Sequence, residues 1–250
     1  MEIDRPNLGN KALSKVVEMS IANQLDEAES IDVDIRTNPG KLVQGKLDSV
    51  TISGKGLVMQ QDLRMETLEV SIGKVGIDPF SAVFGNIELI HPTDAEALIV
   101  LTQTDLNRAF RSDYIQAKLR GLKMIMNGQE IIVTVQQVIV NLPGDNKFVI
   151  NIDFLLADQT EIKKLSVTAI PKIQEDGDRI SLEILAIKGQ GLNLDFVSVI
   201  VEQLTALLDL RNFIIPGLSL QLYKLEAPQG QLVIHSHAQV VQVAPMIDLI

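Results

Sequence analysis

The chain has 250 residues, of which 46% are hydrophobic and only 4% aromatic, and it carries a formal net charge of −10. A pI of about 4.8 gives no general attraction to a phosphate backbone, so the composition argues against a nucleic-acid-binding protein. The absence of cysteine excludes a disulfide framework and thiolate chemistry. The mean hydropathy is nevertheless +0.20, which indicates more aliphatic surface than a minimal core needs; a well-filled β-rich core is the alternative explanation.

The sequence shows no export signal and no transmembrane segment. It begins MEIDRPNLGNK, with two acids and a proline where a signal peptide would have its apolar core. The longest apolar runs, such as IIVTVQQVIVNL, are too short to span a bilayer. We therefore expect a cytoplasmic or peripheral membrane protein.

Most of the chain has the alternating pattern of β-strands. Residues 9–27 first predict a helix, and Ile31–Arg36 then alternates strictly, which is typical of a strand with one wet face. The segment 41–46 is ambiguous. Further strands are predicted within 50–59, 68–72, 131–140, 148–154, 165–169, 180–186, 218–222 and 232–238. Turn residues at 143–146 and 175–178 predict two hairpins.

The segment Leu101–Leu122, which follows Ala95–Val100, predicts a second helix. Thr102 and Asp105 can each satisfy a free N–H of a first helical turn, and Gly121 can close the helix. At about 100° per residue, one side carries Leu106, Ala109, Phe110 and Ala117. The other side mixes Ile115, Leu119 and Leu122 with Arg108, Arg111 and Lys118. A helix with apolar residues on both sides needs two partners.

A third helix is predicted over 193–211. Its wide aliphatic stripe consists of Val197, Ile200, Val201, Leu204, Leu207 and Leu208. No linker or low-complexity stretch divides the chain, so we expect residues 1–250 to form a single α+β domain. In that domain three amphipathic helices pack against long antiparallel strands.

The sequence gives no residue-level support for an enzyme, and we predict no catalytic residue, no cofactor and no metal site. Two G-x-G sites lack the third glycine of a dinucleotide-binding loop. His235 and His237 share one strand face beside Gln239 and could begin a metal site, but a polar face in water explains them as well.

The run LTQTDLNRAF, residues 101–110, together with 95–100 and the strand 31–36 after an amphipathic helix, resembles the LmeA-like phospholipid-binding family. Thr102, Asp105, Leu106 and Asn107 form the T-x-x-D-L-N core of that resemblance. The family is bacterial, with many members in cyanobacteria and actinobacteria. The resemblance implies a tubular lipid-binding (TULIP-like) fold, in which a highly curved, long-stranded antiparallel sheet wraps around amphipathic helices and encloses an apolar cavity. The related actinobacterial members are exported, whereas this chain shows no signal.

We therefore expect a protein that binds phospholipid or another acyl lipid at a membrane surface, with lipid transfer as a further expectation. The candidates for the cavity are Leu106, Phe110, Val197, Ile200, Val201, Leu204 and Leu208. The candidates for contact with the membrane and its headgroups are Arg108, Arg111, Lys118, Ile115 and Leu119. Ordinary core packing is the alternative for the first group, and burial under another element for the second.

Two other functions remain open. A non-catalytic protein–protein interaction module of the cell envelope or membrane would use the same apolar surface. A lipid-modifying enzyme would need a polar cluster, for which His235 and His237 are the available nucleus.

Overall fold

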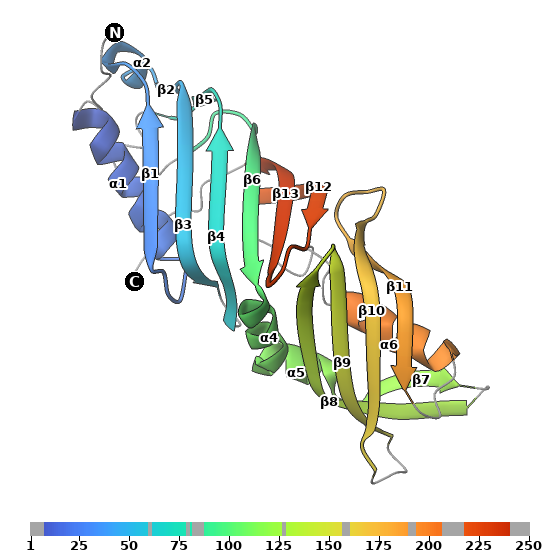
Figure 1. The fold of residues 1–250 in the computed structure, drawn as a ribbon. Helices are drawn as coiled ribbons and strands as arrows, with labels where there is room; N and C mark the ends of the chain where they lie inside the picture. Colours follow the sequence, from blue (N-terminus) through green and yellow to red (C-terminus); the bar gives the residue numbers. More distant parts are fainter. Residues whose placement is uncertain are drawn as a thin grey trace.

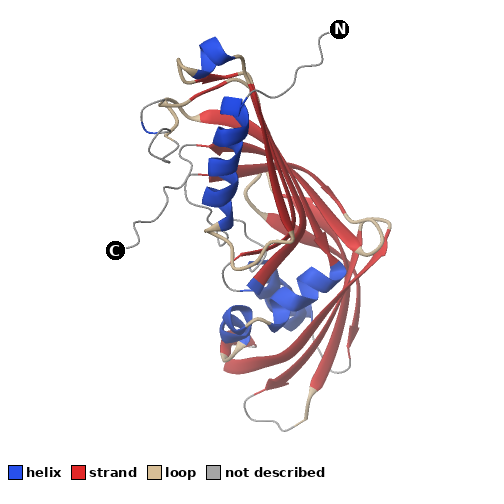
Figure 2. Ribbon diagram, turned by 90° about the vertical axis from the view of Figure 1, so that its left-hand side faces the viewer, coloured by secondary structure: helices blue, strands red, loops and turns tan. Residues whose placement is uncertain are grey.

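The computed structural model describes residues 8–59, 62–78, 81, 88–126, 129–156, 161–189, 194–206 and 218–240. Most of the described residues belong to two antiparallel sheets, which follow one another along the length of the molecule (Figure 1). The single curved sheet of the sequence-based prediction is wrong in this respect. The coarser prediction, a mainly antiparallel and strongly curved structure with a few helices, is confirmed (Figure 2).

The first sheet has six strands, and it combines the first strand of the described chain with the last two. In spatial order it consists of β1 (Ser30–Arg36), β3 (Ser49–Met59), β4 (Leu63–Ile72), β6 (Thr93–Thr102), β13 (Gln231–Val240) and β12 (Leu218–Glu226). β3 runs without interruption through Gly54–Gly56, where Gly56 adopts a φ of 56°. A small sheet of β2 (Lys46–Leu47) and β5 (Val75–Gly76) lies at one end.

The second sheet has five strands in the order of a simple meander. It consists of β11 (Ile180–Gly189), β10 (Lys163–Ile173), β9 (Lys147–Leu156), β8 (Gln129–Gly144) and β7 (Leu122–Met126). Both predicted hairpins are present. Asp145 and Asn146 have φ values of 54° and 55°, the paired positive values that join two twisted strands tightly, and Gly177 lies in the β10–β11 turn. β7 was not predicted, because five residues beside a helix give too short a pattern.

The helices cover different parts of the two sheets. α1 (Leu8–Ala22) packs on β1, and the short α2 (Pro39–Leu42) lies near the start of α1 (Figure 2). α4 (Gln103–Arg111) contacts β4, β6 and β8, so it lies where the sheets meet. α5 (Asp113–Leu119) contacts β8, and α6 (Leu194–Ala206) contacts β7 and β11, the two edge strands of the second sheet. The predicted third helix extended to 211; residues 207–211 lie outside the described part.

One large core joins both sheets. Its buried members come from β6, β12 and β13 of the first sheet, from β7 to β11 of the second, and from α4, α5 and α6. A separate N-terminal core lies between α1 and the first sheet, with Leu13, Val17, Val33 and Ile35 among its members. The large core is therefore formed by residues that are distant in sequence.

Candidate functional site

The T-x-x-D-L-N segment lies where the two sheets meet. Thr102 is the last residue of β6 and the N-cap of α4, so the strand passes directly into the helix. The Asp105 amide donates to Thr102 Oγ1 at 3.1 Å, and the Thr102 amide donates to Asp105 Oδ2 at 2.8 Å. This reciprocal capping box confirms the role predicted for the two residues, and it satisfies backbone donors that the first helical turn leaves free.

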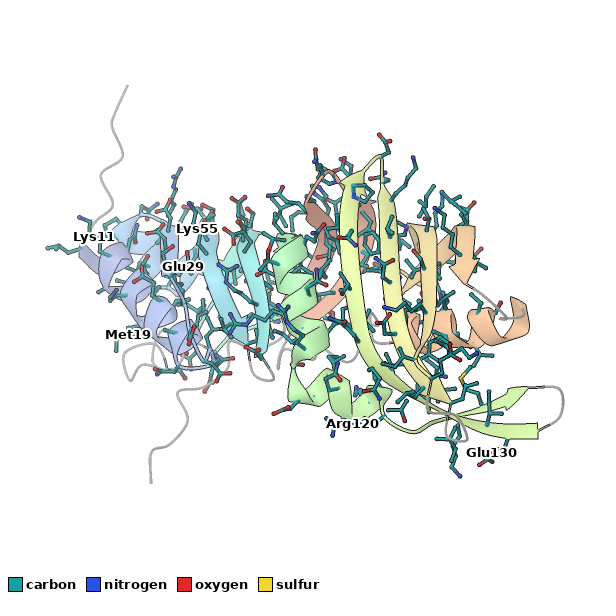
Figure 3. The ribbon with its side chains drawn as sticks, turned by 60° about the horizontal axis from the view of Figure 1, so that its bottom comes forward. Lys11, Met19, Glu29, Lys55, Arg120 and Glu130 are labelled. Atoms are coloured by element: carbon teal, nitrogen blue, oxygen red, sulfur yellow. The ribbon has the colours of Figure 1, made fainter. Side chains whose placement is uncertain are left out.

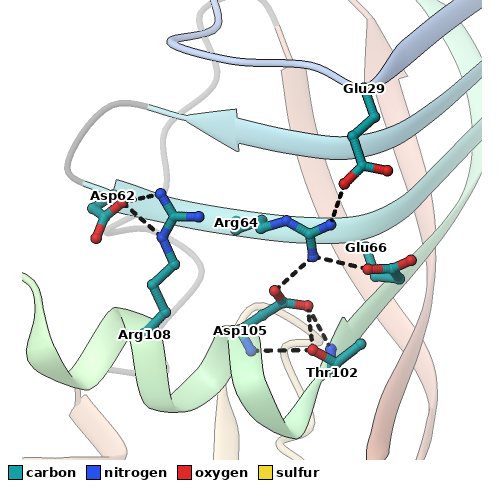
Figure 4. A network of polar contacts seen from close by, with 7 residues as sticks. All are labelled: Glu29, Asp62, Arg64, Glu66, Thr102, Asp105 and Arg108. Atoms are coloured by element: carbon teal, nitrogen blue, oxygen red, sulfur yellow. Dashed lines mark hydrogen bonds and ion pairs between the residues drawn. The ribbon is translucent and has the colours of Figure 1, made fainter.

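Asp105 also anchors a network of charged side chains around Arg64 (Figure 4). Arg64 Nη1 donates to Asp105 Oδ1 and to Glu66 Oε2, both at 2.8 Å, and Nη2 donates to Glu29 Oε1 at 2.8 Å. Hydrogen bonds to Glu66, Asp105 and Glu29 raise the pKa of Arg64 above its usual range. Because Asp105 is 3% exposed, this permanently charged guanidinium compensates a buried carboxylate.

Arg108, a predicted headgroup contact, forms an ion pair with Asp62. Its Nε donates to Asp62 Oδ1 at 2.8 Å, and the same hydrogen bond raises the pKa of Arg108. Figure 4 shows this pair beside the Arg64 network, between α4 and the start of β4. An anionic headgroup would have to compete with Asp62 for this side chain.

Asn107 and Gln103 bind α4 to the second sheet. Asn107 Nδ2 donates to the Val140 carbonyl at 2.8 Å, while Asn107 Oδ1 accepts from the Val140 amide at 2.9 Å. Gln103 Oε1 accepts from the Leu142 amide at 2.7 Å. The two side chains thus pair with the backbone of β8 as a neighbouring strand would. The sequence marked Asn107 as part of a motif, and the structure places it with Gln103 in a joint between the sheets.

Other hydrogen bonds of the same joint come from turns. The Gly230 amide in the β12–β13 turn donates to the Leu142 carbonyl at 2.8 Å, and the Gln103 amide donates to the Gly230 carbonyl at 2.9 Å. The Leu222 amide on β12 donates to the Gly177 carbonyl in the β10–β11 turn at 2.6 Å. Sequence reasoning missed these contacts because their partners are far apart along the chain.

The structure gathers the described cavity candidates in the large core. Leu106 and Phe110 are 7% and 8% exposed. They share that core with Val197, Ile200 and Val201 of α6, which are all buried. The side chain of Leu204 and all of Leu208 lie outside the described part of the chain. The packing of the five described residues fits either role, a filled core or the wall of a space that opens for a ligand.

Two of the predicted membrane contacts are wrong. Ile115 and Leu119 are 4% and 1% exposed and belong to the large core, so neither is available at the surface. The reason is a break in the predicted helix at Ser112, whose backbone is extended with φ −62° and ψ 147°. Ser112 then caps α5 by accepting from the Ile115 amide at 3.3 Å. The new helix has its own axis, which directs these two side chains inward.

The cationic side chains at the end of α4 and along α5 remain at the surface. Arg111, Lys118 and Arg120 are exposed, and Figure 3 shows Arg120 beside α5. Lys118 Nζ lies 4.3 Å from the centre of the Tyr114 ring, a cation–π contact. Because Ile115 and Leu119 are buried, the surface at α4 and α5 lacks the apolar part of the predicted membrane contact.

His235 and His237 lie on the outer face of β13 but contact different carboxylates. His237 Nδ1 is 2.8 Å from Glu96 Oε1, and His235 Nε2 is 3.4 Å from Glu226 Oε2. Tyr223 stacks on His237 with ring centres 4.5 Å apart. Desolvation raises the pKa of Tyr223, and the hydrogen bond with Lys224 lowers the pKa of Glu226. Among the described residues, no group of three or more His, Asp or Glu side chains could hold a metal ion.

Two shallow hollows occur on the described surface, and neither includes a cavity candidate. One, of about 390 Å³, lies between the β8–β9 and β12–β13 turns and includes Asn146 and Glu226. The other, of about 360 Å³, lies on the outer face of the second sheet and includes Asn151 and Lys188. Both linings include charged side chains, Asp145 and Glu226 in the first and Asp153 and Lys164 in the second, so neither is suited to an acyl chain.

Together, curved antiparallel sheets, an aliphatic core shared by distant segments and amphipathic helices define a class of β-rich protein with an extended aliphatic interior. A family model described as LmeA-like phospholipid-binding matches residues 7–237. The chain therefore belongs to the LmeA-like phospholipid-binding family, as its T-x-x-D-L-N segment indicated. No curated protein matches the chain. In the part of the chain that the structure describes, every helix is too short or too polar to cross a bilayer.

Proposed function

We propose that this protein binds phospholipid through the acyl chains, in the apolar interior between the second sheet and α6, and that it transfers lipid between membranes. Membership of a phospholipid-binding family is the observation that carries the proposal. The composition of the interior supports it. The inward faces of β9 and β10 consist of Phe148, Ile150, Ile152, Phe154, Leu165, Val167 and Ala169, all buried and all without a polar atom in the side chain.

Such an interior can bind a flexible tail without directional contacts. Each methylene removed from water contributes about 0.8 kcal/mol, so a tail of about 16 carbons provides roughly 12 kcal/mol of driving force before the costs of association. An interior with few aromatic residues adapts to a bent chain, because Leu, Ile and Val offer no flat surface that favours a ring.

α6 is the element whose displacement would admit a tail. It contacts the edge strands β7 and β11, and a helix satisfies its own backbone hydrogen bonds. Moving it outward would expose Val197, Ile200 and Val201 together with the inward face of the second sheet, and no strand pairing would break. In this proposal these three residues line the acyl site, with Leu106 and Phe110 at its border towards α4.

The test is direct. Protein purified without detergent is extracted with organic solvent and the extract is examined by lipid mass spectrometry, while delipidated protein is titrated with a fluorescent phospholipid. We expect co-purified phospholipid and saturable uptake. Protein that is lipid-free and takes up no fluorescent phospholipid would contradict the proposal and favour an interaction module.

A variant pair on α6 tests where the tail lies. Val201→Phe enlarges a buried side chain that is 6% exposed, and overpacking costs about 1–3 kcal/mol. We expect it to lower phospholipid uptake severalfold, because the ring occupies the space of the tail. Ser198→Phe, on an exposed residue of the same helix, is the control. Equal losses in the two variants would contradict this location.

A further inference from the structure

The two most exposed large hydrophobic side chains among the described residues lie at the same end of the molecule. Leu8, the first residue of α1, is 88% exposed, and Val43, which follows α2, is 79% exposed. Ile90, beside the small β2–β5 sheet, is 52% exposed. Figure 2 shows the first turn of α1 and α2 together at the end of the first sheet that is far from α4, α5 and α6.

Hydrogen bonds hold the backbone at this end, so the exposed side chains belong to an ordered part of the chain. The Asn38 side chain caps α2 by accepting from the Lys41 amide at 2.9 Å. The Ile77 amide donates to the Gly45 carbonyl at 2.7 Å, and the Ile90 amide donates to the Gly76 carbonyl at 2.9 Å.

Val43 and Ile90 each follow a residue that packs into the protein. Leu42 and Leu89 pack against the N-terminal core, whereas the next residue in each case, Val43 or Ile90, is exposed. Exposing an aliphatic side chain on an anchored turn is unfavourable in water, and several together mark a surface that meets an apolar partner.

We propose that Leu8, Val43 and Ile90, the apical cluster, insert into the surface of a phospholipid bilayer. The inference rests on the proposed function, since a lipid-binding protein must reach its lipid, and it adds the part of the molecule that does so. The cluster lies on the start of a helix and on turns at a narrow end. A stable protein–protein interface needs about 800 Å² on each partner, whereas a bilayer accepts a few protruding side chains.

The charges around the apical cluster fit the boundary of a bilayer. Lys11, Lys41, Lys46 and Lys74 are exposed at this end, and Figure 3 shows Lys11 extending from α1. Long lysine side chains can place their stems in the headgroup region and their ammonium groups in water. Lys41 is paired with Asp48 at 2.6 Å, and Glu88 is also exposed. Because the charges are mixed, apolar insertion and not net charge drives the contact.

The absence of tryptophan from the chain allows a single-reporter experiment. Val43→Trp places one indole in the apical cluster, and Leu185→Trp places one on β11, where Leu185 is 48% exposed. Phosphatidylcholine vesicles should shift the emission of Val43→Trp to shorter wavelength, and brominated phosphatidylcholine should quench it. The Leu185→Trp emission should remain unchanged. Equal quenching of the two reporters, or none of Val43→Trp, would overturn the inference.

A second set of variants separates docking from lipid binding. The triple variant Leu8→Ser, Val43→Ser, Ile90→Ser should lose at least tenfold in vesicle affinity, because each aliphatic side chain contributes about one order of magnitude to partitioning. It should retain its co-purified phospholipid. The control Leu185→Ser should dock as the unmodified protein does. Wild-type protein without lipid contradicts the proposed function, whereas a triple variant that docks normally overturns only the apical contact.

Two further outcomes would assign the cluster differently. Docking that disappears at roughly 0.5 M salt, where surface charges are screened within a few ångströms, would favour the exposed cations of α4 and α5. A short-wavelength emission of Val43→Trp without vesicles, together with a dimer mass in light scattering, would show that a second copy covers the cluster. Docking that persists in high salt and a monomeric mass in solution support the bilayer contact.

Discussion

The residues of the T-x-x-D-L-N segment have structural roles that can be stated atom by atom. Thr102 and Asp105 cap α4, Leu106 is buried in the large core, and Asn107 pairs with Val140 on β8. The most recognisable segment of the family is therefore, in this chain, a joint between two sheets. Because each contact requires a particular donor or acceptor, few substitutions would preserve it.

Asn107→Leu tests this joint at the scale of one residue. The leucine matches the amide in size but leaves the amide and carbonyl of Val140 without their partner, and Val140 is 2% exposed. Unsatisfied buried groups cost about 1–3 kcal/mol, so the free energy of unfolding in urea should fall by about 2 kcal/mol. The control is Gln136→Leu, an exposed residue on the same strand, which should change it little. Equal losses in the two variants would show that the joint has no special importance.

At the scale of elements, Ser112 decides which residues face the interior. Its hydroxyl accepts from the Ile115 amide and donates to the Ala109 carbonyl at 2.8 Å, so it ends α4 and begins α5. A continuous helix would have placed Ile115 and Leu119 opposite Leu106. Two short helices place all three residues in one core.

Ser112→Ala should destabilise α5, the helix that Ser112 caps. Loss of an N-cap side chain costs about 1 kcal/mol, and the Ile115 amide would then exchange with solvent more readily. Hydrogen exchange followed by mass spectrometry should show that exchange in α5 is faster in the variant than in the unmodified protein, whereas exchange in α1 is unchanged. Ser198→Ala, an exposed position within α6, serves as the matched substitution. Unchanged exchange in α5 would contradict the assignment of Ser112 as the cap that orients the helix.

At the scale of the whole molecule, the two sheets divide the proposed tasks. The second sheet and α6 form the interior proposed for the acyl chains, and the far end of the first sheet carries the apical cluster. The joint around α4 connects the two regions through Asn107, Gln103 and the β12–β13 turn. A rigid connection would keep the lipid site at a fixed position relative to the membrane contact.

Lipid bound in the interior should stabilise the whole molecule. A ligand that binds only the folded state adds about 2.7 kcal/mol when its free concentration is about 100 times the Kd. Delipidated protein should therefore melt at a lower temperature than protein carrying phospholipid, and reloading should restore the Tm. Equal melting temperatures before and after delipidation, with lipid shown to be bound again, would place the lipid outside the core.

Local patterns were sufficient for much of this structure. Alternation within Ile31–Arg36 and 148–154 predicted strands, because a strand with one buried face requires an apolar residue at every second position. Thr102 and Asp105 predicted the start of α4, because a capping box is formed by residues three apart and needs no distant partner. The family was likewise recognisable from the run 101–110 together with the order of the elements around it.

The sequence by itself determined most of the long strands, the start of α4, the aliphatic composition of the interior and the family. Only the tertiary structure decided that there are two sheets, that Ile115 and Leu119 are buried, that Arg108 pairs with Asp62, and that Leu8 and Val43 are exposed at one end. The physical reason is the distance along the chain over which each effect acts. Periodicity and capping depend on neighbours a few residues apart, whereas burial and ion pairing depend on which distant segment arrives at the same place.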